Sequence, residues 1–456
     1  MSVTKRIIII AIFLLFGSVI FAQSQSEIES LCQKSVAAAQ NGDFATAKQN
    51  YDSAISLIAK NPNSDLVLAV PEDLSEYIII TQAQTNPEEA RKCALTLLEL
   101  QMHCLSYYAS QGFFESKEDY VDNISVAMIS MGYTMADAGL LKDAEECLSA
   151  GVAIYPQSEI YTLDYPMAYE RLGYFYSEYC QDYISELNCK YEGFKTSVSL
   201  FGYDAELTQQ IFSRLTTAYA FNFAFLAFVG ESGERFQTND VKHVPYEQLI
   251  KLTEEWDRFR SEIVSANGDN QYQALLNVTP INLNGEPRIR FGSKSWDLFY
   301  RALADLHYSR IKDYEAYVQD LIDSLSDCDD IIAYSRDLIT SLRNHNQVNL
   351  AFDLYERLAN KVASRKDLVE SVNDMAGELA LAYGFYDKAW TYVKDLETNI
   401  DSVDYCNKEA HLRRLSLLGS LYRIDGQYQK NVEVCLNALE IAETDSVSVP
   451  ISLRKM

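Results

Sequence analysis

The chain has 456 residues, of which 48% are hydrophobic and 23% are charged, a composition typical of a folded protein with a large apolar core. Its formal net charge is −26, with 65 Asp and Glu residues against 39 Lys and Arg residues. Because such a chain repels phosphate groups, its charge excludes nucleic acid and anionic membrane surfaces as main partners.

The first residues resemble a secretory signal. Lys5 and Arg6 precede an unbroken apolar run over residues 7–16, and a sequence typical of a bacterial cleavage site ends at Ala22. We therefore predict that residues 1–22 are a signal peptide and that the mature chain is periplasmic or secreted. An uncleaved anchor is the alternative, although the apolar stretch is shorter than the roughly 20 residues of a spanning helix. No later apolar run is long enough, so no membrane span is expected after cleavage.

Four stretches of the chain share one spacing of small and aromatic residues. In each, a glycine interrupts a helical pattern and apolar residues of a second helix follow at fixed distances. The four sets are Gly42, Ala47, Tyr51 and Ala54; Gly139, Ala144, Leu148 and Gly151; Gly384, Ala389, Val393 and Leu396; and Gly426, Asn431, Cys435 and Ala438. Twelve positions before the second member of each set stand Ser35, Gly132, Gly377 and Gly419. Small residues on both helices predict that the two helices approach closely.

This pattern resembles the tetratricopeptide repeat, a family of helix–turn–helix units of about 34 residues, here of an exported, Gram-negative bacterial type. The resemblance implies an all-α solenoid that binds other proteins. We expect roughly twelve to eighteen helices, in two arrays over residues 23–228 and 296–442. Residues 229–295 do not match; we interpret them as an irregular junction or one divergent repeat, with a helix over 246–265. Residues 443–456 are the predicted tail.

Other units match the repeat less well. Leu172 and Gly173 suit a first helix, but no alanine follows at the expected distance. Leu338, Leu342 and Ala351 indicate a weaker unit before the last two repeats.

Motifs for catalysis and metal binding are absent from the sequence. The five histidines lack HxxxH or HExxH spacing, and there is no GxSxG elbow, P-loop or GxGxxG. The nine cysteines form no CxxC pair and are expected to be small buried side chains, with a bond between Cys180 and Cys189 left open. We therefore expect no enzyme activity, no metal and no cofactor.

Tyrosine is abundant, with 31 residues, and seven of these lie within residues 161–183. They either fill the space between helices or offer contact area with a polar tip at an interface. In the repeat family, the first helix of each pair lines the concave surface. This layout nominates as partner-binding residues Tyr133, Asp137, Tyr174, Glu178, Glu378, Arg413 and Arg423.

A mixed aromatic and acidic groove would suit an extended peptide with basic residues, whereas the arginine end would accept an acidic one. The alternative for the arginines is a set of salt bridges to Glu409 or Asp425. Some family members clamp a partner's C-terminal carboxylate with a lysine and an asparagine. The corresponding positions here hold other residues, such as Glu170 and Tyr174, so that mode is not expected.

These observations predict an exported, non-enzymatic scaffold that binds a protein or peptide in the bacterial envelope. The alternative is the sensory region of an envelope two-component signalling protein, of histidine kinase type, whose downstream segments are absent from this chain. The last repeat ends near Ala442, and Pro450 disfavours a long capping helix, which favours the alternative. The lack of a second spanning helix counts against it, and the gene sequence beyond Met456 would distinguish the two.

Overall fold

The computed structural model describes residues 24–228, 246–279, 290–308, 310–324, 338–398 and 408–443. Within these ranges the chain is helical apart from turns, short loops and one isolated bridge at Arg290. The predicted all-α class is therefore confirmed. The predicted signal peptide, with its cleavage site after Ala22, and residues 444–456 of the predicted tail lie outside the described residues.

The chain forms two compact units. Their residues are Met1–Asn222 with Ile250–Thr279, and Phe223–Leu249 with Pro280–Met456. Two of the three boundaries fall inside helices, since α9 (Glu206–Phe228) and α10 (Tyr246–Asn267) each contribute residues to both units. Helix α10 begins where the sequence predicted a helix within the segment 229–295. Whether that segment is a junction or a divergent repeat stays a prediction, because much of it lies outside the described residues.

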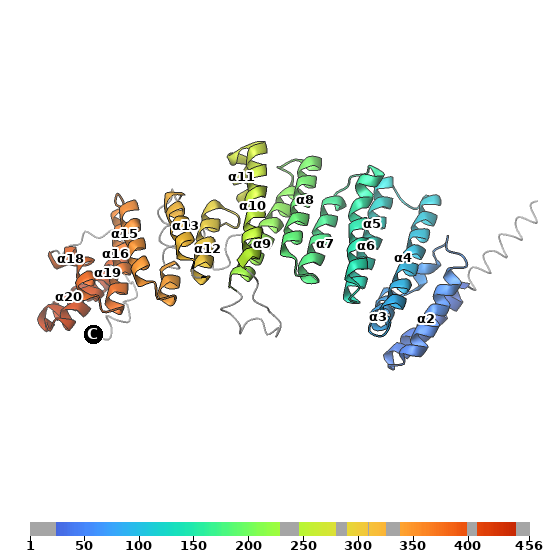
Figure 1. Ribbon diagram of the computed structural model, residues 1–456, viewed down its shortest axis with the longest axis horizontal. Helices are drawn as coiled ribbons and strands as arrows, with labels where there is room; N and C mark the ends of the chain where they lie inside the picture. The colour runs from blue at the N-terminus through green and yellow to red at the C-terminus, as the bar shows by residue number, and fades with distance from the viewer. Residues whose placement is uncertain are drawn as a thin grey trace, which may run out of the picture. The chain divides into compact units, whose positions relative to one another are not determined.

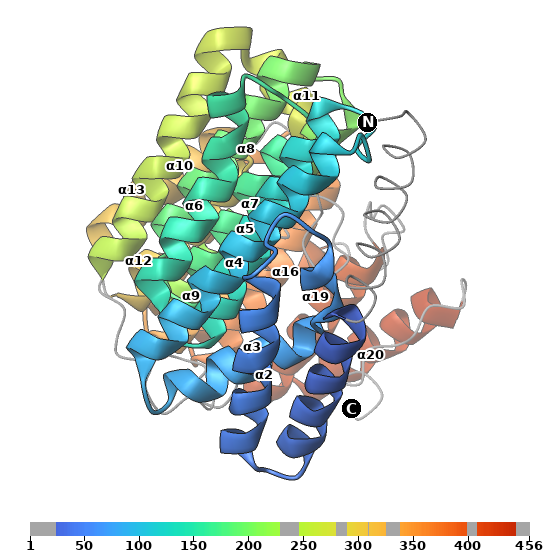
Figure 2. The same cartoon turned by 90° about the vertical axis from the view of Figure 1, so that its right-hand side faces the viewer.

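The first unit is a series of helices that follow one another in chain order as antiparallel pairs (Figures 1 and 2). A helix over residues 24–40 is joined to α2 by a hydrogen bond from Ser35 to Ala47, and the next pairs are α3 with α4, α5 with α6, and α7 with α8. The bounds are α2 (Phe44–Ile58), η1 (Leu66–Ala69), α3 (Glu72–Ala83), α4 (Pro87–Ser110), α5 (Lys117–Asp137), α6 (Leu141–Ser158), α7 (Asp164–Glu178), α8 (Tyr183–Phe201) and α11 (Asp269–Leu276).

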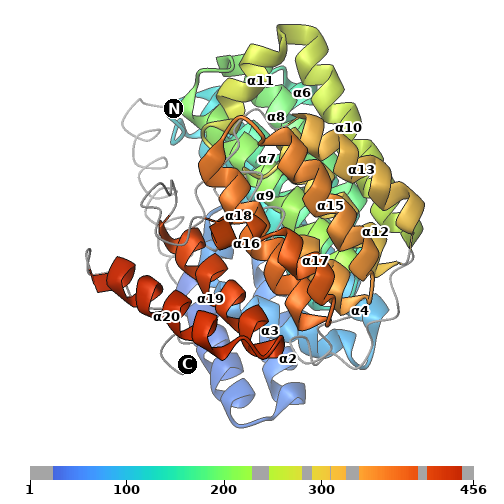
Figure 3. The ribbon, with the colours of Figure 1, turned by 90° about the vertical axis from the view of Figure 1, so that its left-hand side faces the viewer.

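The second unit repeats this arrangement (Figure 3). A helix over residues 338–344 precedes α15, and the pairs in contact include α12 with α13, α16 with α17, and α19 with α20. The bounds are α12 (Lys294–His307), α13 (Ile311–Ser324), α15 (Val348–Lys361), α16 (Lys366–Ala382), α17 (Tyr386–Thr391), α18 (Lys394–Thr398), α19 (Lys408–Ile424) and α20 (Tyr428–Glu443).

The structure has more helices than the roughly twelve to eighteen that were expected, and their labels run to α20. One reason is that the second helix expected over Ala389, Val393 and Leu396 is divided into α17 and α18. The division frees the carbonyl oxygen of Tyr392, which accepts a hydrogen bond of 2.9 Å from the buried guanidinium of Arg414. A distant side chain thus satisfies a backbone group that a continuous helix would pair internally.

One turn geometry joins the helices of all four predicted repeats. The glycines at its centre have positive φ between 73° and 76°, and the N–H of the next residue donates to the carbonyl oxygen five positions back. This is the Schellman motif, whose left-handed position favours glycine. Those glycines are Gly42, Gly139, Gly384 and Gly426.

The weaker unit before the last two repeats uses the same turn. Asn346 takes the place of glycine with a φ of 57°, and the N–H of Gln347 donates to the Leu342 carbonyl oxygen at 2.8 Å. Asparagine tolerates the left-handed region better than most residues, so the turn is retained. The two helices predicted there are present, joined by this turn.

Small residues allow the two helices of a pair to approach closely. A Cβ atom added to Gly132 of α5 would lie 2.7 Å from Cγ of Leu148 and 3.2 Å from the carbonyl oxygen of Ala144, both on α6. A Cβ atom added to Gly151 of α6 would lie 2.8 Å from Ile129. The pair therefore has no room for a side chain at either glycine.

Serine hydroxyls fill two of these narrow gaps with hydrogen bonds. Ser125 Oγ of α5 donates to the Gly151 carbonyl oxygen at 2.8 Å, and Ser35 Oγ donates to the Ala47 carbonyl oxygen at 2.6 Å. Both serines are fully enclosed, so the bonds replace water at buried polar atoms. Ser35 stands where the other repeats have glycine, and its short side chain keeps the approach close.

The weak match at Gly173 is a complete helical pair. A Cβ atom added to Gly173 of α7 would lie 3.2 Å from the Glu186 carbonyl oxygen, and one added to Gly193 of α8 would lie 2.9 Å from the Pro166 carbonyl oxygen. Glu186 is thirteen positions after Gly173, whereas the other repeats have twelve between the facing residues. The turn between these helices also differs, with Gln181 at a φ of 53°. The missing alanine therefore reflects a shifted contact.

We predict that Gly132→Val lowers the free energy of unfolding by about 1–3 kcal/mol, because the added side chain forces α5 and α6 apart. Ala37→Val is the matched control, since Ala37 lies on an exposed helical face. Valine there should lower the free energy of unfolding by under about 1 kcal/mol, because its β-branched side chain has a lower helix propensity than alanine. Urea unfolding followed by circular dichroism measures both. Equal loss in the two variants would contradict the close-packing account.

Candidate functional site

Four of the nominated residues lie on α5 and α7 of the first unit. The rings of Tyr133 and Tyr174 meet edge to face with centroids 6.0 Å apart, and Tyr133 Oη donates to the Arg171 carbonyl oxygen at 2.6 Å. Burial raises the pKa of Tyr133 to about 12, whereas the Tyr174 ring is 51% exposed. Tyr133 is thus held in place by packing, and Tyr174 offers a ring face to solvent beside it.

Asp137 joins this group through a residue that the sequence analysis did not nominate. Tyr179 Oη donates to Asp137 Oδ1 at 2.6 Å, and the Tyr179 ring lies 6.3 Å from that of Tyr133. Glu178 is exposed on α7 and lies near enough to Tyr183 to contribute, after burial and Glu186, to its raised pKa. The structure therefore gathers Tyr133, Asp137 and Tyr174 into one aromatic and acidic patch, with Glu178 on the same helix as Tyr174.

The other nominated residues belong to the second unit. Arg413 of α19 forms ion pairs with Asp374 of α16 at 2.8 Å and with Glu409 at 3.4 Å. The salt bridge to Glu409 that the sequence suggested is therefore present. Glu378 of α16 and Arg423 near the end of α19 are exposed. A role for these residues in binding a partner stays a prediction.

Most tyrosines of the rich segment fill space between helices. Tyr155 stacks on Tyr165 at 4.8 Å, and Tyr165 contacts Tyr169 at 5.6 Å. Some tyrosine hydroxyl groups in and beside this segment donate to carboxylates on neighbouring helices, which fixes the helices to each other. In the first unit these donor and acceptor pairs are Tyr155 with Asp122, Tyr176 with Glu145, Tyr179 with Asp137, and Tyr191 with Glu262.

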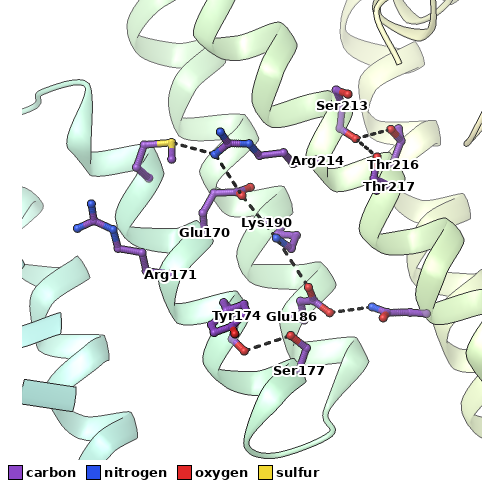
Figure 4. Close-up of polar contacts among 12 residues, drawn as sticks. Glu170, Arg171, Tyr174, Ser177, Glu186, Lys190, Ser213, Arg214, Thr216 and Thr217 are labelled. Atoms are coloured by element: carbon purple, nitrogen blue, oxygen red, sulfur yellow. Dashed lines mark hydrogen bonds and ion pairs between the residues drawn. The ribbon is translucent and has the colours of Figure 1, made fainter. Parts of the chain in front are cut away.

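A buried ionic network lies between α7, α8 and α9 (Figure 4). Lys190 Nζ is 3.4 Å from Glu170 Oε2 and 3.7 Å from Glu186 Oε1, and all three side chains are 12% exposed or less. Asn222 donates to the other oxygen of Glu186 at 2.8 Å, and Arg214 lies 3.8 Å from Glu170. Lys190 thus lies between the two buried carboxylates, and Arg214 adds a second positive charge near Glu170.

Burial raises the pKa of Glu186, against the opposing effects of the Asn222 hydrogen bond and the Lys190 charge. This network could have been predicted from the sequence. Glu186 and Lys190 are four residues apart and share the face of α8 that carries Gly193 toward α7. Charged residues on the packed face of a helix indicate a buried pair. We assign the network a structural role, because its charges are directed at each other.

An open groove of about 530 Å³ lies between η1, α3, α4 and α5 in the first unit. Leu68 of η1 is 65% exposed and Val126 of α5 is 45% exposed, and both line the groove. Its volume lies in the range of about 300–1,000 Å³ that is typical of ligand pockets. The groove was not predicted from the sequence, because it follows from helix lengths, which periodicity alone does not determine.

Acidic residues border this groove on the side of α3. Glu72 and Glu76 line it, and Ser130 Oγ of α5 donates to Glu72 Oε1 at 3.1 Å. Burial raises the pKa of Glu76, and the charges of Glu72, Asp73 and Asp137 raise it further. Asp137 therefore links the acidic border to the patch formed by Tyr133 and Tyr174.

No group of three or more His, Cys, Asp or Glu side chains in the described part of the chain is arranged to hold a metal ion. Cys180 and Cys189 are free thiols, and burial raises the pKa of Cys189 to about 12, which keeps it protonated at neutral pH. None of the helices whose residues are described is long and apolar enough to cross a bilayer.

Comparisons with known proteins yield no family. No family model and no curated protein matches the chain. A solved structure described as a circular tandem repeat protein with novel repeat topology and enhanced subunit contact surfaces is similar at 11% identity, over 95% of this chain and 94% of that chain, with a TM-score of 0.36. That similarity is too distant to inform function. The helices themselves define the class: this is an all-α helical repeat protein.

We predict that Lys190→Met lowers stability by about 3–5 kcal/mol at neutral pH, because it leaves the buried carboxylate of Glu186 without a cation and that of Glu170 with Arg214 alone. The loss should shrink as the pH falls through the raised pKa of Glu186, since protonation then removes the uncompensated charge. Lys142→Met is the control, because Lys142 is 88% exposed and forms a surface ion pair with Glu146. Its loss should lower the free energy of unfolding by under about 1 kcal/mol. A pH-independent loss for Lys190→Met would contradict this assignment.

Proposed function

We propose that this chain is a non-catalytic scaffold, related to tetratricopeptide repeat proteins, that binds a protein or peptide partner in the bacterial envelope. A helical repeat fold is compatible with such a role, since stacked pairs present extended surfaces for interaction. The observation that carries the proposal is the patch of Tyr133, Tyr174 and Asp137. It combines an exposed aromatic ring with charge on helices whose positions are fixed by close packing.

The chemistry of this patch suits recognition. Tyrosine is enriched at protein interfaces because its ring offers a large contact area and its hydroxyl a hydrogen bond, at a low entropic cost. Tyr133 is already fixed by its hydrogen bond to the Arg171 carbonyl oxygen, so little freedom is lost when a partner contacts the ring pair. A binding role needs no reacting group, and for that reason we propose that the chain is not an enzyme.

Export is the second part of the proposal and rests on the sequence. Residues 1–22 have the charged start, apolar run and cleavage site of a signal peptide. We predict that the chain recovered from its native host begins at Gln23 and is found in the periplasmic or secreted fraction. Mass spectrometry of the intact protein measures this, and a mature chain that keeps residues 1–22 would contradict it.

The binding surface is tested by comparing two neighbouring positions on α7. Tyr174→Ala should weaken binding to a partner captured from the envelope fraction more than Glu178→Ala does, because an aromatic anchor contributes more than an exposed charge. Both side chains are exposed, so the helical circular dichroism signal should not change. If both variants retain full affinity for an identified partner, the patch is not the binding surface.

A further inference from the structure

We propose that the groove between η1, α3, α4 and α5 binds a peptide segment that combines apolar side chains with lysine or arginine. The inference rests on the proposed scaffold function and adds a site and a ligand chemistry to it. It is based on the groove itself, on its exposed apolar wall and on the acidic residues Glu72 and Glu76 that line its edge.

The groove exists because α3 is short. Helix α3 has 12 residues, whereas its neighbours α4 and α5 have 24 and 21. Val70 and Pro71 are extended, so α3 cannot begin before Glu72. The reason is that the residue preceding a proline is disfavoured in the α conformation. The second half of α4 and the first half of α5 therefore lack a full neighbouring helix, and η1 covers them only in part.

Apolar side chains form the wall that this gap leaves open. Leu68 and Val126 are exposed, and Tyr108 lies on the opposite helix, α4, with its ring 5.0 Å from that of Phe113. Exposed leucine and valine in a concave site lose their contact with water when an apolar ligand enters, at roughly 25 cal/mol per Å² of buried surface. The wall thus favours a ligand with aliphatic side chains.

Charge decides which kind of apolar ligand fits. Glu72 and Glu76 are four residues apart on one face of α3, a spacing at which like charges repel. The carboxylates of Glu72, Asp73 and Asp137 all lie near enough to Glu76 to raise its pKa, after the larger effect of burial. A cation placed between them would relieve this repulsion, so the groove complements a lysine or arginine next to the apolar residues.

Binding of model peptides tests the proposal. The probes are a short fluorescein-labelled peptide of alternating leucine and lysine, one with glutamate in place of each lysine, and one with serine in place of each leucine. Fluorescence anisotropy with the purified chain should show at least about tenfold tighter binding of the first peptide than of either control. Equal binding of the glutamate peptide, or of the serine peptide, would overturn the proposal.

Matched variants separate the groove from general attraction to a chain of charge −26. Leu68→Ser should weaken binding of the leucine and lysine peptide by about tenfold, whereas Leu163→Ser, at a similarly exposed leucine outside the groove, should not. Glu72→Gln with Glu76→Gln should weaken it by a similar factor, and Glu146→Gln on α6 should leave it unchanged. Groove variants that bind like the unsubstituted chain would place the peptide elsewhere and refute the site.

The two proposals fail in different ways. If groove variants leave peptide binding unchanged while Tyr174→Ala weakens binding to an identified partner, the groove inference is wrong and the scaffold function stands. If Tyr174→Ala has no effect on that partner but the groove variants lose the peptide, the groove binds and the aromatic patch was wrongly chosen.

Discussion

The close approach of two helices at small residues is the constraint on which the rest of this structure depends. Gly132 and Gly151 face backbone and branched side chains of the opposite helix without room for a Cβ atom. The Schellman turn at Gly139 sets the antiparallel return that makes this contact possible. Because each pair is fixed in this way, its outer faces are left to contact the next pair, and the side chains on those faces keep defined positions.

Contacts between successive pairs use the acidic composition of the chain. Tyrosine hydroxyls donate to carboxylates on neighbouring helices, as Tyr176 does to Glu145 and Tyr191 to Glu262. Part of the negative charge therefore serves packing, and the network around Lys190 uses two more carboxylates. The carboxylates of α3 differ, because their neighbours are also acidic. This difference separates charge that stabilises the fold from charge that is available to a partner.

The sequence predicted the class, the four clear repeats and their turns, because small residues and glycines at fixed spacing have one simple physical interpretation. It underestimated the pair at Gly173, where the facing residue is shifted by one position and is Glu186 in place of an alanine. It nominated Tyr133, Asp137 and Tyr174, which lie together, but missed Tyr179. It could not show the groove, since the length of α3 depends on how Pro71 and the preceding turn pack.

The central claim is that the surface formed by α3, α5 and α7 in the first unit contacts the partner. Site-specific photocrosslinking in the native host tests it most directly, with a photoreactive residue at Val126 or Tyr174, and at Lys142 on α6 for comparison. All three positions are exposed. The account predicts a discrete crosslinked protein from Val126 and Tyr174 and little or none from Lys142. Equal yields from Lys142, or adducts from Lys142 alone, would contradict it.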